Sequence, residues 1–142
     1  MTQMDYEIYP QALESCIRKV YQELQIPIMV TENGIAVDDD QKRVEFIEKA
    51  TDGVLSCLKD GIPVKGYLYW SLMDNFEWQK GYSMTFGLIA VDRRTQKRTP
   101  KGALHIRKCP LRRFREFVEM VGYDEFVGTT KYIGGNYNEI II

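Results

Sequence analysis

The sequence predicts an α/β fold in which helices alternate with parallel strands. Apolar residues recur at helical spacing in two segments, and a short apolar run follows each segment, so that the order along the chain is helix, strand, helix, strand. Strands that alternate with helices in this way are typical of βα units, whose parallel strands are joined by right-handed crossovers. We therefore expect a parallel sheet that is covered by helices.

The first predicted helix covers residues 10–24, where apolar side chains form one stripe: Leu13, Cys16, Ile17, Val20, Tyr21 and Leu24. Pro10 suits its start, because that position needs no N–H donor. The apolar run from Ile26 to Val30 does not alternate with polar residues, which is typical of a strand buried on both faces. We expect this strand to end at a polar turn, Thr31-Glu32-Asn33-Gly34.

The second helix is predicted from Val44 to Leu58, and Asp60 and Gly61 end it. The aspartates at positions 38–40 precede this helix, where carboxylates accept hydrogen bonds from free N–H groups. They lack the alternating ligands and central glycine of a calcium loop. The second apolar strand runs from Val64 to Trp70.

The rest of the chain is less regular. We predict an extended segment from Phe86 to Val91, a turn at residues 92–95 that leads into residues 97–99, and a last amphipathic helix from Leu111 to Val121. Residues 123–142 show no clear period.

Charge and hydropathy argue against two classes of function. The net charge of the 142 residues is −1, so no overall field favours nucleic acid or anionic lipid. Ten Lys and Arg residues and no acids lie between Arg93 and Arg115, which leaves a nucleic-acid binder as an alternative, although a solvated basic face is commoner. The residues from Met1 onward lack the charged and then apolar pattern of a leader, so we expect none, and no apolar run approaches the roughly 20 residues of a membrane helix. We expect a cytoplasmic protein with no nucleic-acid or membrane partner.

Cysteine and histidine give no sign of a metal or cofactor. Three cysteines cannot form a self-contained disulfide set. Cys16 and Cys57 lie on apolar stripes and are expected to be buried, reduced thiols, whereas Cys109 has no evident partner. The lone His105 is expected at the surface. We therefore predict neither a metal site nor a cofactor.

Both predicted strands end in polar and aromatic residues. Glu32 follows the first strand, Trp70 ends the second, and Glu77 lies on the loop after it. In parallel α/β folds the loops at the carboxyl ends of the strands converge, and ligands bind there. Carboxylates beside flat rings suit a sugar site. Each feature also has an ordinary explanation, since Asn33-Gly34 is a common turn and Trp70 alone would fit a core.

In linear order, these motifs resemble glycoside hydrolase family 1, the β-glucosidases. The likeness rests on Pro27-Ile28-Met29-Val30-Thr31-Glu32-Asn33-Gly34, then Trp70-Ser71-Leu72-Met73-Asp74-Asn75-Phe76-Glu77-Trp78, and continues through Gly81-Tyr82-Ser83, Phe86-Gly87-Leu88 and residues 95–101. It covers about residues 5–103. The resemblance implies that residues 1–103 form the C-terminal part of a (β/α)8 TIM barrel, strands seven and eight with their flanking helices. Residues 104–142 are then a divergent tail with no assigned role.

The resemblance also implies roles for individual residues. Glu32 would be the nucleophile of a retaining β-glycosidase that hydrolyses terminal β-D-glucosyl or galactosyl residues. Trp70 would stack on the sugar, Glu77 would bind its O4 and O6 hydroxyls, Trp78 would donate to O3, and Phe86 would close the side of the pocket. Relatives that act on 6-phosphorylated sugars lack the glutamate at this place, so Glu77 implies an unphosphorylated β-glucoside or related small saccharide.

The second carboxyl group of a retaining glycosidase, its acid/base, is absent from this chain. The family carries it in an Asn-Glu-Pro motif, and Asn138-Glu139 is followed by Ile140 instead. A whole barrel takes roughly 250 residues. We therefore expect the isolated chain to be inactive, with open strand edges that a second chain or self-association would complete. The alternative is a non-catalytic sugar-binding or partner-completed barrel module.

Overall fold

The computed structural model describes residues 1–105. Its elements follow in the order α1 (Gln11–Leu24), β1 (Ile28–Asn33), α2 (Asp40–Lys59), β2 (Val64–Tyr69), the 3-10 helix η1 (Trp78–Lys80), β3 (Ile89–Val91), β4 (Arg98–Pro100) and the 3-10 helix η2 (Gly102–His105). The predicted order of helix, strand, helix and strand is confirmed. The predicted last helix, Cys109 and the tail from residue 106 lie outside the described residues.

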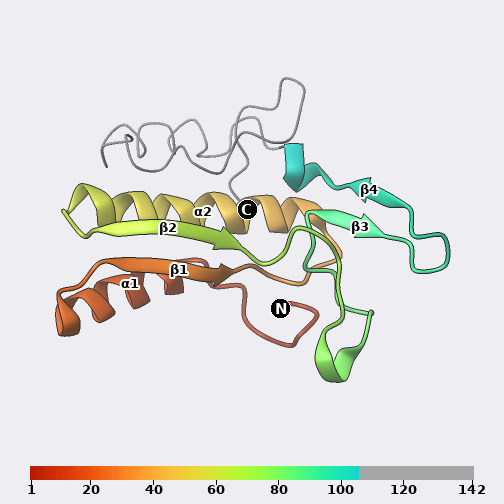
Figure 1. The fold of residues 1–142 in the computed structure, drawn as a ribbon, viewed down its shortest axis with the longest axis horizontal. Helices are drawn as coiled ribbons and strands as arrows, with labels where there is room; N and C mark the ends of the chain where they lie inside the picture. Colours follow the sequence, from red (N-terminus) through yellow and green to blue (C-terminus); the bar gives the residue numbers. More distant parts are fainter. Residues whose placement is uncertain (106–142) are drawn as a thin grey trace.

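β1 and β2 are parallel neighbours, with Ile28 opposite Val64 and Asn33 opposite Tyr69. Figure 1 shows both arrows pointing the same way, with the N-terminal segment, the loops after the strands and the β3–β4 hairpin gathered at the arrowhead end. The hairpin is a separate antiparallel pair. Its turn is closed by the amide of Asp92, which donates to the carbonyl of Lys97 at 2.9 Å. The predicted parallel strands and the predicted turn are therefore confirmed.

The helix ends have clear local causes. Pro10 precedes α1, and Gln25 ends it in the left-handed conformation at φ 53°. The side chain of Asp39 caps α2 by accepting a hydrogen bond from the amide of Gln41 at 3.0 Å. A carboxylate at this position satisfies a free N–H group of the first turn. Asp39 thus starts the helix as expected, and Asp40 is the first residue of α2.

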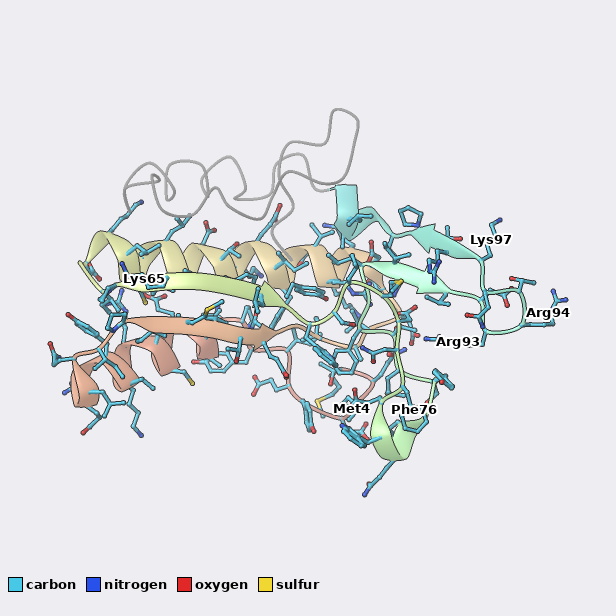
Figure 2. The ribbon with its side chains drawn as sticks, in the orientation of Figure 1. Met4, Lys65, Phe76, Arg93, Arg94 and Lys97 are labelled. Atoms are coloured by element: carbon cyan, nitrogen blue, oxygen red, sulfur yellow. The ribbon has the colours of Figure 1, made fainter. Side chains whose placement is uncertain are left out.

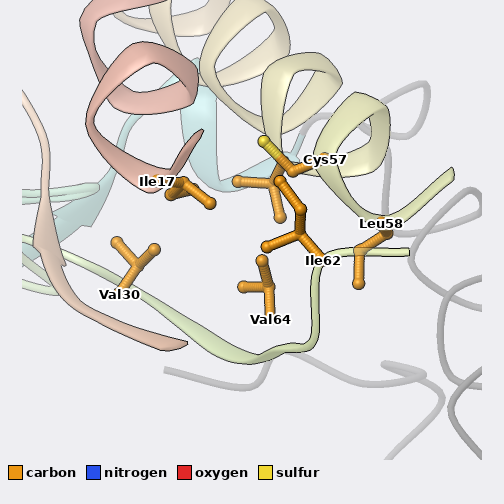
Figure 3. Close-up of a cluster of buried hydrophobic side chains, with 7 residues drawn as sticks. Ile17, Val30, Cys57, Leu58, Ile62 and Val64 are labelled. Atoms are coloured by element: carbon orange, nitrogen blue, oxygen red, sulfur yellow. The ribbon is translucent and has the colours of Figure 1, made fainter. Parts of the chain in front are cut away.

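The main core lies between the two helices and the strand pair, as Figure 3 shows. Its buried members come from all four elements and the turn before β2: Ile17, Val30, Val54, Cys57, Leu58, Ile62 and Val64. The helices approach closely where a Cβ on Gly53 would lie 2.9 Å from the Cβ of Glu14. Burial of these apolar side chains is the main force that holds α1 and α2 against the strands.

Three expectations are wrong. β1 continues through Asn33, because its ladder with β2 extends to that residue, so Glu32 belongs to a strand and not to a turn. β1 is not buried on both faces within the described residues, since Met29 is 51% exposed while Val30 is buried. Cys16 is exposed, because the buried face of α1 is centred on the neighbouring Ile17.

Candidate active site

The ends of β1 and β2 are joined directly. The amide of Trp70 donates to the carbonyl of Asn33 at 2.9 Å. The turn that follows passes so close that a Cβ on Gly34 would lie 1.8 Å from the carbonyl oxygen of Trp70. Only glycine leaves room for this approach. The motif that contains Glu32 and the motif that begins at Trp70 therefore meet at one point of the structure.

Glu32 lies near the end of β1 and is exposed among the described residues. The register with β2 is irregular between Val30 and Asn33. Such an irregularity interrupts the alternation of side chains along a strand, and it is often found beside active sites, where it re-aims a side chain. The exposure changes across the same stretch, since Glu32 is exposed although Val30, two residues earlier, is buried.

Asn33 links the two strands through its side chain as well. The hydroxyl of Tyr67, on β2, donates to Oδ1 of Asn33 at 2.8 Å. The residue after the candidate nucleophile is thus fixed at both its carbonyl and its amide side chain. The sequence does not indicate this contact between Tyr67 and Asn33, because Asn33-Gly34 has the composition of an ordinary turn.

Trp70 is 39% exposed at the end of β2, and the peptide bond between Trp70 and Ser71 is cis. Ser71 is buried beneath the loop, where its hydroxyl donates to the carbonyl of Met73 at 2.9 Å and accepts from Nδ2 of Asn75 at 3.2 Å. The loop therefore folds back on itself immediately after Trp70, and the Trp70 side chain stays partly exposed at the end of β2.

Glu77 and Trp78 lie further along the same loop. The amide of Glu77 donates to the carbonyl of Gly81 at 2.7 Å, which closes a small loop around η1. Trp78 is 82% exposed. No hydrogen bond joins Glu32 to Glu77 within residues 1–105. The structure therefore brings Asn33, the residue after Glu32, into contact with Trp70. Figure 1 shows η1, which begins at Trp78, on a loop that projects away from the strand ends.

An aromatic pair supports this projection. Phe76 and Tyr82 meet edge to face with their ring centroids 5.3 Å apart. The guanidinium of Arg93 lies 4.3 Å from the centroid of Tyr82, and its Nη2 also donates to the carbonyl of Asp74. A cation over an aromatic face is attracted by the ring quadrupole. Figure 2 shows Arg94 and Lys97 at the tip of the β3–β4 hairpin, apart from the loop that carries Phe76.

Phe86 lies on the return of this loop, between Thr85 and Gly87. Its carbonyl accepts a hydrogen bond from the hydroxyl of Tyr69 at 3.0 Å. Burial raises the pKa of Tyr69 to about 12, against the opposing effect of the positively charged Arg43. Tyr69 therefore stays protonated over the neutral range and acts as a permanent donor to Phe86.

A partly buried contact fixes the start of the same loop. Nζ of Lys101 lies 2.8 Å from Oδ1 of Asp74, and the amide of Gly87 donates to the same oxygen at 2.8 Å. Burial lowers the pKa of Lys101, and the carboxylate of Asp74 partly offsets that effect. A cavity of about 380 Å³ lies beside this pair and beside Arg43. None of the predicted site residues lines this cavity, so it is distinct from the candidate active site.

The part of the chain from residue 1 to residue 105 contains no group of three or more His, Cys, Asp or Glu side chains that could hold a metal ion. Within the same part, no helix combines the length and apolar character that a membrane crossing requires. The described part of the basic block consists of Arg93, Arg94, Lys97, Arg98 and Lys101, and the remainder from Arg107 onward lies outside the described residues.

The comparisons with known proteins agree with one another. The sequence pattern of glycosyl hydrolase family 1 matches residues 1–106. The chain is 40% identical over 110 residues to β-glucosidase A of Thermotoga maritima, covering 70% of this chain and 25% of that enzyme. It is also 40% identical over 110 residues to a 6-phospho-β-galactosidase of Leptotrichia buccalis, covering 70% and 24%.

A solved structure, the β-glycosidase from Pyrococcus horikoshii, superposes with a TM-score of 0.73 at 37% sequence identity, covering 87% of this chain and 30% of that one. The chain thus spans about a quarter of the length of the curated relatives it matches. The α/β arrangement seen here fits these neighbours. On the family match and the shared structure, the chain belongs to glycosyl hydrolase family 1.

Proposed function

We propose that this chain carries the nucleophile part of a retaining β-glycosidase, with Glu32 as the nucleophile. The observation that supports it most is the joint between the strand ends: exposed Glu32 is followed by Asn33, whose carbonyl accepts the amide of Trp70. A carboxylate and an indole at the carboxyl ends of neighbouring strands suit a reaction in which a sugar stacks on the indole and the carboxylate attacks it. In this proposal β1 and β2 are strands seven and eight of a (β/α)8 barrel, and residues 1–103 form the C-terminal part of that barrel.

The reaction would proceed in two steps. The ionised carboxylate of Glu32 attacks the anomeric carbon and forms a glycosyl ester, while the bond to the leaving group breaks and the leaving oxygen takes a proton from an acid. Water then attacks the ester, gives a proton back to the same group, and releases Glu32 and a sugar of unchanged configuration. The acid/base must come from outside this chain, from a residue about 5–5.5 Å from the nucleophile.

The remaining candidates would form the sugar pocket. Trp70 would stack on the apolar face of the pyranose, Glu77 would accept hydrogen bonds from two hydroxyls, Trp78 would donate to a third, and Phe86 would close the side. Glu77 also bears on the substrate class, because a carboxylate repels a phosphate at the sugar's 6-position. We therefore propose unphosphorylated β-glucosides or β-galactosides as substrates, although one similar relative is named as a 6-phospho-β-galactosidase.

A second candidate function follows from the open strand edges. Within residues 1–105, β1 and β2 pair only with each other. Unpaired edges invite further strands. The chain would then be a sugar-binding module that is completed by a second chain or by another copy of itself, with Trp70, Glu77 and Trp78 binding sugar and no turnover.

Labelling with a 2-deoxy-2-fluoro glycoside separates the two functions. The chain would be incubated with this probe alone and together with a separately made N-terminal barrel portion of a family member, and its intact mass would be measured. We expect one sugar label on Glu32 in the mixture and none on the chain alone, because the rest of the barrel is needed to hold the sugar in line with the carboxylate.

The matched control is Glu32→Gln, which keeps the size of the side chain and removes the nucleophile. Its mixture should stay unlabelled. A label on another residue, or labelling of Glu32→Gln, would contradict the assignment. Binding of the sugar without any label in the mixture would favour the sugar-binding module.

A further inference from the structure

We propose that Arg43 and Tyr69 are positioning residues that hold Phe86 in place, an inference whose catalytic meaning rests on the proposed function. Arg43 lies in the first turn of α2, and Tyr69 is the last residue of β2. Neither was a candidate from the sequence. Both are anchored in the described core and reach the loop that carries Phe86.

Arg43 connects the two loops that leave the strand ends. Its side chain is only 1% exposed and forms an ion pair with Asp40. Its Nη2 donates to the carbonyl of Val37 at 2.7 Å, in the loop after β1, and to the carbonyl of Thr85, in the loop after β2. Its Nε has no hydrogen-bond partner, so the two Nη atoms make every bond. One buried guanidinium therefore fixes both loops to the start of α2.

The backbone around Phe86 is held at three successive residues. Besides its bond to Arg43, Thr85 donates from its hydroxyl to the carbonyl of Val37 at 3.0 Å. Tyr69 donates to the carbonyl of Phe86 itself at 3.0 Å, and the amide of Gly87 donates to Asp74 at 2.8 Å. Rotation of the backbone at Phe86 would break at least one of these bonds. The backbone that carries the Phe86 ring is thus held by groups on α2, on β2 and on the loops after both strands.

Space also restricts this segment. A Cβ on Gly87 would lie 2.1 Å from the backbone nitrogen of Asp74. The chain beyond Phe86 is therefore packed against the start of the same loop, which limits how far it can shift. The hydrogen bonds from Arg43 and Tyr69 therefore hold a segment, residues 85–87, that is already restricted by close packing.

The chemistry of arginine suits this task better than that of lysine. Its planar guanidinium presents donors in a fixed fork, whereas an ammonium group is a single point charge on a flexible chain. Arg43→Lys should retain an attraction to Asp40 and lose the simultaneous grip on the two carbonyls. Tyr69→Phe removes one hydroxyl and keeps the ring, so it tests the same idea without changing a charge.

Amide hydrogen exchange on the chain tests the positioning directly. In Arg43→Lys and in Tyr69→Phe, we expect the amides of residues 85–88 to exchange about tenfold faster, the effect of losing roughly one hydrogen bond. Amides of residues 54–58 in α2 should keep their rates. Equal acceleration across the chain, or no change at residues 85–88, would overturn the proposal.

Arg18→Lys is the matched control. Arg18 lies on α1, where it bridges two acids, Glu14 and Asp60, and donates to Ser56 at 2.9 Å, near the far end of α2. The control variant should affect exchange near residue 56 and leave residues 85–88 unchanged. Acceleration at residues 85–88 in the control would show that any loosened arginine has this effect, which also contradicts the proposal.

The labelling mixture tests the consequence for sugar binding. Tyr69→Phe should raise the probe concentration for half-maximal labelling rate about tenfold and leave the maximal rate within about threefold. In a Phe86→Leu background the same change should have no further effect, because both act through one ring. Additive effects would contradict positioning through Phe86. Absence of label in the wild-type mixture would instead contradict the proposed function, and exchange would still decide whether Arg43 and Tyr69 hold the segment.

Discussion

The two ends of the parallel strand pair use similar groups in different surroundings. At the carboxyl end, Arg43 is 1% exposed and forms its ion pair with Asp40 under two loops. At the amino end, Arg18 bridges Glu14 and Asp60 with 36% of its side chain exposed. A buried charge depends on every partner, whereas an exposed one can be solvated instead. The carboxyl end, which carries all the candidate site residues, should therefore tolerate substitution least.

The largest expected difference lies between the two arginines. Arg43→Met would leave the partly buried Asp40 and two loop carbonyls without their donor, and it should lower the free energy of unfolding by about 3–5 kcal/mol. Arg18→Met should have a clearly smaller effect, because water replaces its partners. Urea unfolding followed by circular dichroism measures both. Equal losses would show that burial does not separate the two ends.

Two glycines sharpen the comparison. Gly34→Ala, at the carboxyl end, forces a Cβ towards the carbonyl oxygen of Trp70 and should cost about 3 kcal/mol, the upper end for over-packing. Gly61→Ala, at the amino end, meets open space, but its φ of +80° disfavours a side chain. That strain should cost about 1 kcal/mol. The same urea measurements apply, and a reversed order would contradict the close contact at Trp70.

Alkaline titration probes the carboxyl end through Tyr69. Below about pH 10 both folded and unfolded chains keep this phenol protonated, since its pKa is raised from 10.0 to about 12 by burial. Between these values only the unfolded chain ionises. Folding stability should then fall with rising pH by roughly 2–3 kcal/mol in total. Tyr69→Phe should remove this component from urea midpoints measured at pH 9–12, and an unchanged slope in that variant would contradict it.

The smallest effect is expected for single hydroxyls. Tyr67→Phe removes the bond to Asn33 beside the candidate nucleophile and should cost about 1 kcal/mol. Ser56→Ala removes a bond to the exposed Arg18 at the other end and should cost less. Thermal unfolding of the two variants compares them. A larger loss in Ser56→Ala would weaken the distinction between the ends.

Much of the fold could be predicted because the local patterns were strong. The stripe through Ile17 and the apolar runs at residues 26–30 and 64–70 predicted the helix and both strands. The strand boundary at Glu32 was wrong, because polarity suggested a turn while the ladder with Tyr69 continued. Cys16 was also misplaced, since a helical stripe read from sequence is wider than the face that packs.

The candidate site was only partly accessible from sequence. The hydrogen bond between Asn33 and Trp70 brings together two motifs that are 36 residues or more apart in the chain. The family resemblance implied this arrangement, because it placed the two motifs at the ends of neighbouring strands. Arg43 could not have been found in this way. A single cation at the start of an amphipathic helix is normally solvated, and only the loops that fold over it create its burial.

The contact between Asn33 and Trp70 has a mechanical consequence. With the amide of one strand end bound to the carbonyl of the other, and Gly34 pressed against the same residue, the two ends resist hinging relative to each other. Under the proposed roles, Glu32 and Trp70 belong to one rigid unit and move together. Any opening or closing around a sugar would then occur between this unit and the rest of the proposed barrel. Mutations meant to widen the sugar pocket should therefore be placed at that boundary.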